Sequence, residues 1–258
     1  MVELSIITVF KGDPADLFKT VQSSIGFLKT GRVELLIFSA TELSNEQLKE
    51  LDDFGVKFHL SNAQLYEAMN LGLDNCSGDY VIFMNAGDTF SPNIIVEEIL
   101  NSLSEPIVYF GRAHIIGNKV QWTFPEVPSN LVTTWLKYYL PNHQTMFFPL
   151  QELKSSNIYF DINLPMYADE LFKIKCMTMF GYKFLDVEVC RFFLGGISTK
   201  AVSRKTLITI LSETERPWKS KAHFLVKFVL DKILSAERTK YFRHKIISRL
   251  VIRKGVEK

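Results

Sequence analysis

The sequence predicts an α/β fold in which helices flank a mostly parallel sheet. Apolar runs of strand length alternate with segments whose apolar residues recur at helical spacing, an order typical of parallel strands joined by right-handed crossovers. Turn and capping residues separate these segments. With 258 residues, of which 47% are hydrophobic, the chain can bury the core of one α/β domain.

The first half of the chain supplies the clearest of these elements. Asp13 and Pro14 suit the N-cap and the first position of a helix, and the stretch from Ser44 to Gln47 has the form of a capping box. The expected strands span residues 4–10, 33–38, 56–60, 79–84 and 107–110. The expected helices between them span residues 14–28, 44–54, 64–75 and 92–103.

After residue 110 the alternation loosens. Neither a Gly-x-Gly-x-x-Gly motif nor a P-loop follows the first strand, which disfavours the common dinucleotide- and NTP-binding folds. The later strands are expected over residues 119–124, 145–148 and 187–194, and the later helices over 130–139 and 166–180.

Charge is distributed unevenly along the chain. Residues 216–258 hold 13 Lys and Arg against 3 Asp and Glu, a net charge of +10, whereas residues 1–215 hold 17 against 25, a net charge of −8. We therefore expect an α/β domain over residues 1–215 and a basic, amphipathic helical extension over 216–258. The extension is either a solvated helix or a surface that docks on the anionic inner leaflet of a membrane, which we favour. Nucleic acid is not expected as a partner because the sequence shows no recognition module.

The cysteines and the amino terminus indicate where the protein resides. Cys76, Cys176 and Cys190 lack the spacing of a metal site and are typical of packing residues in a reduced compartment. The amino terminus lacks a signal peptide, and no apolar run reaches the roughly 18 residues that span a bilayer. We expect a cytoplasmic protein that is peripheral at the inner face of the cytoplasmic membrane.

The segment from Ser77 to Asp88 concentrates the functional signal. A short apolar run ends in Asn85-Ala86-Gly87-Asp88, which places polar groups at the carboxyl end of a buried strand, the edge where open α/β sheets bind ligands. Ala86 and Gly87 are small enough for a ligand to approach the backbone. Asp88 is a hard oxygen ligand of the kind that binds Mg²⁺ or Mn²⁺ together with phosphate oxygens. The alternative is a solvated loop that leads into the next helix.

Six motifs in order resemble those of family 2 glycosyltransferases with the GT-A fold, the fold of nucleotide-diphospho-sugar transferases. Residues 65–73 are similar to the family's "IYDAMNKGI" helix, and residues 77–88 are similar to its "TGDYI.FLNAGD" stretch. The other matches are the opening strand at residues 5–10, Asn142-His143-Gln144, Ala168-Asp169 and Gly195-Gly196-Ile197-Ser198. The resemblance covers about residues 3 to 200. It is nearest to the colanic-acid-type branch, which builds bacterial surface polysaccharides such as lipopolysaccharide and capsule.

The resemblance implies an inverting, metal-dependent hexosyltransferase. Its donor would be a nucleotide sugar, a UDP-sugar before others, and its acceptor a hydroxyl of a glycan or lipid-linked oligosaccharide. Asp169 matches the general base, and Asp88 would hold Mn²⁺ or Mg²⁺ on the diphosphate. The implied donor-side residues are Thr8, Phe10, Tyr66, Asn70, Asn85, Ala86, Gly87 and Asp88. The implied residues on the acceptor or sugar side are His143, Gly195, Gly196 and Ser198.

Departures from the family pattern leave alternatives open. Residues 38–42 lack the Asp and Gly of the family's "DGGSTDGT" stretch, whose Asp contacts the base, and residues 61–64 replace its "DKG". The nucleotide is therefore open, and so is a non-catalytic member that binds nucleotide or glycan without turnover. From the residues alone, Asp169 could be a helix N-terminal carboxylate, His143 a structural histidine and Tyr66 a core residue.

Overall fold

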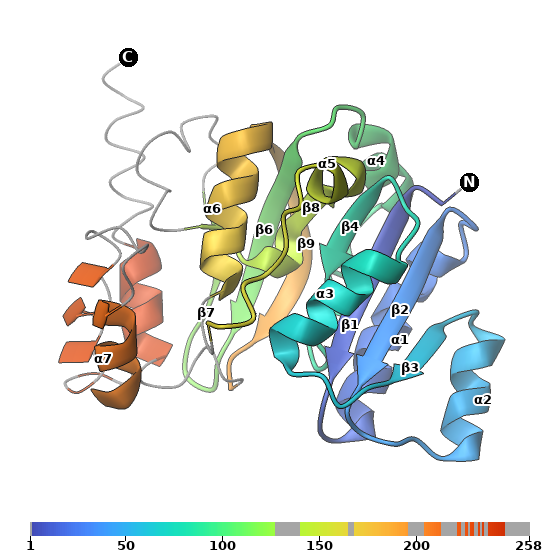
Figure 1. The fold of residues 1–258 in the computed structure, drawn as a ribbon, viewed down its shortest axis with the longest axis horizontal. Helices are drawn as coiled ribbons and strands as arrows, with labels where there is room; N and C mark the ends of the chain where they lie inside the picture. Colours follow the sequence, from blue (N-terminus) through green and yellow to red (C-terminus); the bar gives the residue numbers. More distant parts are fainter. Residues whose placement is uncertain are drawn as a thin grey trace. The chain divides into compact units, whose positions relative to one another are not determined.

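The computed structural model describes residues 2–126, 140–164, 168–195, 204–212 and 237–245, with single residues and pairs between 221 and 234 (Figure 1). The chain forms two compact units. The larger contains residues 1–114 and 141–192, and the smaller contains residues 115–140 and 193–258. The domain boundary expected at residue 215 lies outside the described residues and stays a prediction.

Nine strands of the described chain form one sheet in the order β3-β2-β1-β4-β8-β6-β9-β5, with β7 paired to β6. Strands β1 to β4 pair in parallel, and β8 is antiparallel to both β4 and β6. The predicted α/β class with a parallel sheet at its centre is therefore confirmed. The strands are β1 (Leu4–Phe10), β2 (Val33–Ser39), β3 (Lys57–Leu60), β4 (Tyr80–Phe83), β5 (Thr89–Phe90), β6 (Val108–Ile116), β7 (Gln121–Phe124), β8 (Met146–Pro149) and β9 (Tyr182–Phe193).

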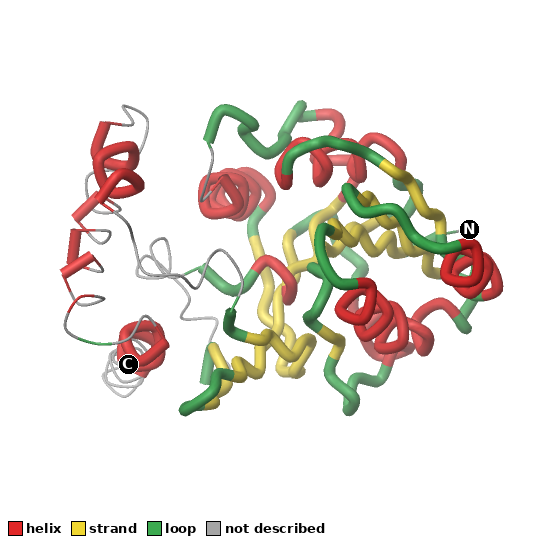
Figure 2. Tube along the Cα trace, turned by 90° about the horizontal axis from the view of Figure 1, so that it is seen from below, coloured by secondary structure: helices red, strands yellow, loops and turns green. Residues whose placement is uncertain are grey.

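Helices of the larger unit lie on both sides of its strands (Figures 1 and 2). Helix α3 contacts β1 and β2, and α1 contacts β2 and β5. In Figure 1, α3 lies in front of the parallel strands and α1 lies behind them. The helices are α1 (Pro14–Leu28), α2 (Asn45–Asp53), α3 (Leu65–Asn75), α4 (Val96–Ser102), the 3₁₀ turn η2 (His143–Thr145), α5 (Leu150–Ser155), α6 (Ala168–Phe180) and α7 (Arg204–Ser212).

Local capping chemistry explains where the first helices begin. Asp13 accepts a hydrogen bond from the backbone N–H of Ala15 (2.9 Å), directly before α1. Ser44 and Gln47 exchange the two hydrogen bonds of a capping box at the start of α2, as predicted (3.3 and 2.9 Å). These bonds satisfy backbone donors that have no partner within the helix.

The helix expected at residues 92–103 begins later than predicted, at Val96. Residues 89 and 90 instead form β5, which pairs antiparallel with β9. Ser91 is also engaged there, since its N–H donates to the carbonyl of Val189 (2.9 Å) and its hydroxyl donates to Glu188 (2.8 Å). Because β5 and Ser91 bind to β9, Ser91 does not cap the helix, and the helix starts at Val96. The helix expected at 130–139 lies outside the described residues.

The core consists mainly of the apolar strands, and all three cysteines are buried and free. In the smaller unit, the described segment 237–245 packs on β7. Trp122 donates from Nε1 to Nδ1 of His244 (2.8 Å), and the ring of Phe124 stacks on the same imidazole at 3.9 Å. None of the helices in the described ranges is long and apolar enough to cross a membrane.

Candidate active site

The loop that follows β4 is a tight turn held by α1. Thr20 of α1 donates from Oγ1 to the carbonyl oxygen of Asp88 (2.6 Å) and accepts from the backbone N–H of Gly87 (3.0 Å). Gly87 has a φ of 94°, a left-handed conformation that costs glycine little because it has no Cβ. The motif from Asn85 to Asp88, which includes Ala86, is therefore a preorganised turn at the carboxyl end of β4.

The carboxylate of Asp88 is buried and faces the η2 turn. Its Oδ2 accepts a hydrogen bond from Nε2 of Gln144 at 2.5 Å. Gln144 is itself completely buried, and its other carboxamide atom, Oε1, has no hydrogen-bond partner among the described residues. A charge-assisted bond of this kind fixes the orientation of the carboxylate. Gln144 was not among the predicted site residues, although it belongs to the Asn142-His143-Gln144 motif.

Asp169, at the start of α6, meets three polar groups from three segments. Its Oδ1 accepts a hydrogen bond from the hydroxyl of Tyr66 in α3 (3.3 Å). Its Oδ2 lies 3.5 Å from Nδ1 of His143 and 3.4 Å from Nζ of Lys173. About a quarter of the Asp169 side chain (24%) stays accessible, so a reacting hydroxyl can reach it.

The surroundings of Asp169 keep it ionised. Burial raises the pKa of this carboxyl, but the charge of Lys173 and the hydrogen bond and charge of His143 outweigh burial and leave the pKa below its ordinary value. The group is thus a carboxylate at neutral pH, the form that can accept a proton.

His143 lies between Asp169 and the turn that follows β4. Its Nε2 lies 3.4 Å from Nδ2 of Asn85, in the turn after β4, while its Nδ1 faces Asp169. The fold therefore brings Tyr66, Asn85, His143 and Asp169 into one site, with Asp88 beside it through Gln144. These residues come from motifs that were identified separately in the sequence.

Thr8 and Phe10 lie at the carboxyl end of β1, next to that site in the sheet order. Both are buried, and Oγ1 of Thr8 has no hydrogen-bond partner in the part of the chain that the structure describes. The carbonyl of Phe10 accepts from the N–H of Ala40 (3.0 Å), which ties the ends of β1 and β2 together. Their predicted contact with the nucleotide stays a prediction.

Asn70 uses its carboxamide to brace a neighbouring segment. Its Nδ2 donates to the carbonyl of Phe160 and its Oδ1 accepts from the N–H of the same residue, both at 2.9 Å. The ring of Phe160 then stacks on Phe172 of α6 (4.1 Å) and on Tyr66 (5.7 Å). Asn70 thus supports the residues around Asp169, and its predicted donor contact stays a prediction.

The remaining predicted residues belong to the Gly-Gly loop. Gly195 is part of the smaller unit, is exposed and has a φ of 142°, whereas Gly196 and Ser198 lie outside the described residues. Their place on the acceptor side stays a prediction.

The side chains near Asp88 that could bind a metal limit how a divalent ion could be held. Among the described residues, no group of three or more His, Cys, Asp or Glu could bind a metal. The carboxylate of Asp88 and the unpartnered carboxamide oxygen of Gln144 are oxygen donors of the kind that suits Mg²⁺ or Mn²⁺. This set fits an ion whose remaining positions are filled by phosphate oxygens and water.

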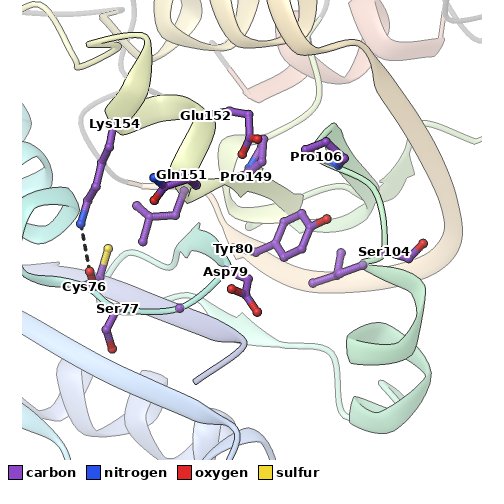
Figure 3. A pocket seen from close by; sticks show the side chains of 13 residues that line it. Cys76, Ser77, Asp79, Tyr80, Ser104, Pro106, Pro149, Gln151, Glu152 and Lys154 are labelled. Carbon is purple, nitrogen blue, oxygen red and sulfur yellow. Dashed lines mark hydrogen bonds between the residues drawn. The ribbon is translucent and has the colours of Figure 1, made fainter. Parts of the chain in front are cut away.

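A separate cavity of about 460 Å³ lies at the amino end of β4 (Figure 3). Its lining includes Asp79, Glu152 and Lys154, and Nζ of Lys154 donates to the carbonyl of Cys76 (3.1 Å). Because Asp88 follows the other end of β4, this cavity is not part of the candidate site.

The overall structure resembles solved structures of S. aureus TarS at low sequence identity. S. aureus TarS aligns with a TM-score of 0.61 and 16% identity, covering 88% of this chain and 43% of the TarS chain. TarS 1–349 in complex with UDP aligns with a TM-score of 0.60 and 17% identity, covering 91% of this chain and 73% of that one. TarS 1–349 in complex with UDP-GlcNAc aligns with a TM-score of 0.60 and 16% identity, covering 88% and 72%. This chain thus spans less than half of the first of these TarS chains, and at such identities the likeness shows the fold.

The sequence itself matches a family profile over most of its length. The profile described as "Glycosyl transferase family 2" matches residues 5–183, which include the turn after β4, the η2 segment and Asp169. No curated protein matches the chain. The predicted GT-A fold is confirmed, and the chain belongs to glycosyl transferase family 2.

Proposed function

We propose that this protein is an inverting hexosyltransferase that moves a sugar from a nucleotide-sugar donor to a hydroxyl of a glycan or lipid-linked oligosaccharide. The observation that carries the proposal is an ionised, partly accessible Asp169 in one site with the turn after β4. The TarS structures hold UDP and UDP-GlcNAc, which supports a UDP-sugar as the donor.

On the acceptor side, Asp169 takes the proton. The acceptor oxygen forms its bond to the anomeric carbon while the bond from that carbon to the diphosphate breaks, and the hydroxyl proton passes to the carboxylate. Tyr66 and His143 orient the carboxylate for this transfer. With one base and no enzyme nucleophile, the displacement is single and inverts the anomeric carbon.

On the donor side, the turn after β4 receives the diphosphate. Mn²⁺ or Mg²⁺ on the diphosphate, when bound, supplies positive charge as the leaving group takes up negative charge. Asp88 would hold that ion in the orientation that Gln144 imposes. Thr8 and Phe10 would line the nucleoside, with Ala86 and Gly87 admitting the diphosphate close to the backbone.

The basic extension supplies a surface for the membrane. Residues 216–258 carry a net charge of +10, and the described part exposes Leu225, Val226 and Val229. A basic helix with an apolar face binds at an anionic membrane surface, where a lipid-linked acceptor would lie. We therefore propose a cytoplasmic enzyme that is peripheral at the inner leaflet and acts in surface-polysaccharide synthesis of the colanic-acid type.

Vesicle binding tests the membrane contact. Replacing Leu225 and Val229 together by glutamate should abolish sedimentation with vesicles that contain phosphatidylglycerol, whereas Ile95→Glu, at an exposed apolar residue of the larger unit (55% exposed), should not. Equal sedimentation of the two variants would exclude this surface as the membrane contact.

Donor binding and turnover, measured separately, test the catalytic proposal. UDP, GDP, CDP and TDP are added with and without Mn²⁺, and a true ligand raises the melting temperature by mass action. Asp169→Asn should lower kcat by about 10²- to 10⁴-fold and leave the response to UDP unchanged, while Asp53→Asn, at an exposed carboxylate of α2, should change neither.

The same experiment distinguishes the competing function, a non-catalytic member that binds nucleotide or glycan. Stabilisation by a nucleotide without turnover in the unmodified protein would favour that alternative. Unchanged turnover in Asp169→Asn would show that Asp169 is not the base.

A further inference from the structure

Lys173 is a buried cation whose contacts reach beyond the carboxylate of Asp169. It lies one helical turn after Asp169 on α6 and is 7% exposed. A lysine in the interior is rare unless its charge is paired, because an unpaired ammonium loses its hydration without compensation. Here Nζ lies 3.4 Å from Oδ2 of Asp169.

The same ammonium reaches a second segment of the site. Nζ of Lys173 donates to the carbonyl oxygen of Pro141 at 3.2 Å. Pro141 directly precedes the stretch that carries His143 and Gln144, which in turn contact Asp169 and Asp88. One side chain therefore joins the start of α6 to the segment that orients the donor-side carboxylate.

We propose that Lys173 is a positioning residue for the transfer reaction, which holds Asp169 ionised and aligned while it anchors the segment from Pro141 to Gln144. This inference rests on the proposed role of Asp169 as the base. Lys173 is only 7% exposed, so we assign it an effect through Asp169 rather than through contact with a substrate.

If Lys173 keeps Asp169 ionised, its removal should change how kcat depends on pH. The titratable groups facing Asp169 are Tyr66 from α3, His143 from the η2 segment and Lys173 on α6 itself. Burial raises the pKa of Asp169, and Lys173 is the strongest of the influences that lower it. Removing the ammonium should therefore let the carboxylate protonate at a higher pH, whereas a purely structural role would leave the pH profile in place.

The test compares two lysines of the same helix. Lys173→Met removes the buried charge and keeps much of the side-chain volume, and Lys175→Met removes an exposed lysine of α6 as the matched control. We expect Lys173→Met to lower kcat at least about tenfold and to move the acidic limb of kcat upward by about one pH unit or more. Because it also releases the segment from Pro141 to Gln144, it should raise the KM for a UDP-sugar as well. Lys175→Met should behave as the unmodified protein does.

Two further variants keep the test decisive. Lys173→Gln is neutral and can still donate to Pro141, so it should fold where the methionine variant does not and should show the same shift of the acidic limb. In an Asp169→Asn background, Lys173→Met should cause no additional loss of kcat, because the two residues act as one unit.

The outcomes separate this inference from the proposed function. An unchanged pH profile in Lys173→Met or Lys173→Gln, with Asp169→Asn inactive, overturns the role of Lys173 and leaves Asp169 as the base. Full activity of Asp169→Asn overturns the proposed base, and the role of Lys173 with it.

Discussion

Replacing Gly72 by alanine tests how closely α3 packs on the sheet. A β-carbon at this position would lie 2.6 Å from Cγ2 of Ile7 and 2.9 Å from its Cδ1, whereas ordinary contact begins at 3.4 Å. The helix and β1 must therefore separate by about 0.8 Å (3.4 minus 2.6 Å), or Ile7 must leave its rotamer. The first of these adjustments moves α3, the element that carries Tyr66.

The magnitude follows from two opposing effects. Overpacking a core costs about 1 to 3 kcal/mol, and replacing a helical glycine by alanine gains about 1 kcal/mol. Gly26→Ala in α1 is the matched control, because its β-carbon would lie at an ordinary 3.8 Å from Cγ2 of Val96. Gly26→Ala should stabilise the protein by about 1 kcal/mol. Gly72→Ala should be about 1 to 3 kcal/mol less stable than that control, which is the cost of the clash alone.

Urea unfolding and steady-state turnover measure the two consequences. A displacement near 1 Å at a catalytic group can cost about 10²-fold in rate, so Gly72→Ala should lower kcat by up to that factor and Gly26→Ala should not. In an Ile7→Ala background, which is itself destabilised, the difference in stability between Gly72→Ala and Gly26→Ala should largely disappear, because the atoms that clash are gone. A Gly72→Ala protein at least as stable as the Gly26→Ala protein would refute the close packing of α3 on β1.

Three further predictions concern the donor site, the smaller unit and the basic extension. Asp88→Asn should abolish the Mn²⁺-dependent part of the stabilisation by UDP, seen as equal melting temperatures with and without Mn²⁺; a persisting Mn²⁺ effect would place the ion elsewhere. His244 has a pKa well below 6.5 because burial and the charges of Lys240 and Arg243 disfavour its protonation. The unfolded chain therefore binds the proton first, and the free energy of unfolding should fall by up to about 1.4 kcal/mol per pH unit below pH 6.5. His244→Phe should flatten this slope in urea unfolding between pH 7.5 and 5.5, and an unchanged slope would contradict the assignment. Deleting residues 216–258 should lower the melting temperature, because Trp122 and Phe124 lose their contacts with the segment at 237–245; an unchanged value would show that this packing adds no stability.

Much of the fold could be predicted because its causes are local. The strand at residues 4–10 and the helix at 14–28 lie where apolar spacing and capping residues placed them, and the helix expected at 166–180 is described from Ala168 to Phe180. Hydrogen bonds within a few residues stabilise such starts and ends, so the sequence alone reveals them. Strand β5 could not be predicted in this way, because its pairing with β9 joins residues about 100 apart.

The candidate site was likewise predictable only where its causes are local. The order of the motifs predicted that Asp88, His143 and Asp169 carry function, since each lies in a recognisable local context. Side-chain partners were not predictable, because they depend on how α3, α6 and the η2 segment pack against the sheet.

The sequence by itself thus determined the α/β class, the resemblance to family 2 glycosyltransferases and the residue types of the site. Only the tertiary structure decided that Tyr66 meets Asp169 across 103 positions, that Gln144 meets Asp88 across 56, and that Lys173 is buried beside the carboxylate. The physical reason is that periodicity and capping act over a few residues, whereas hydrogen bonds between distant side chains exist only once helices and strands have packed.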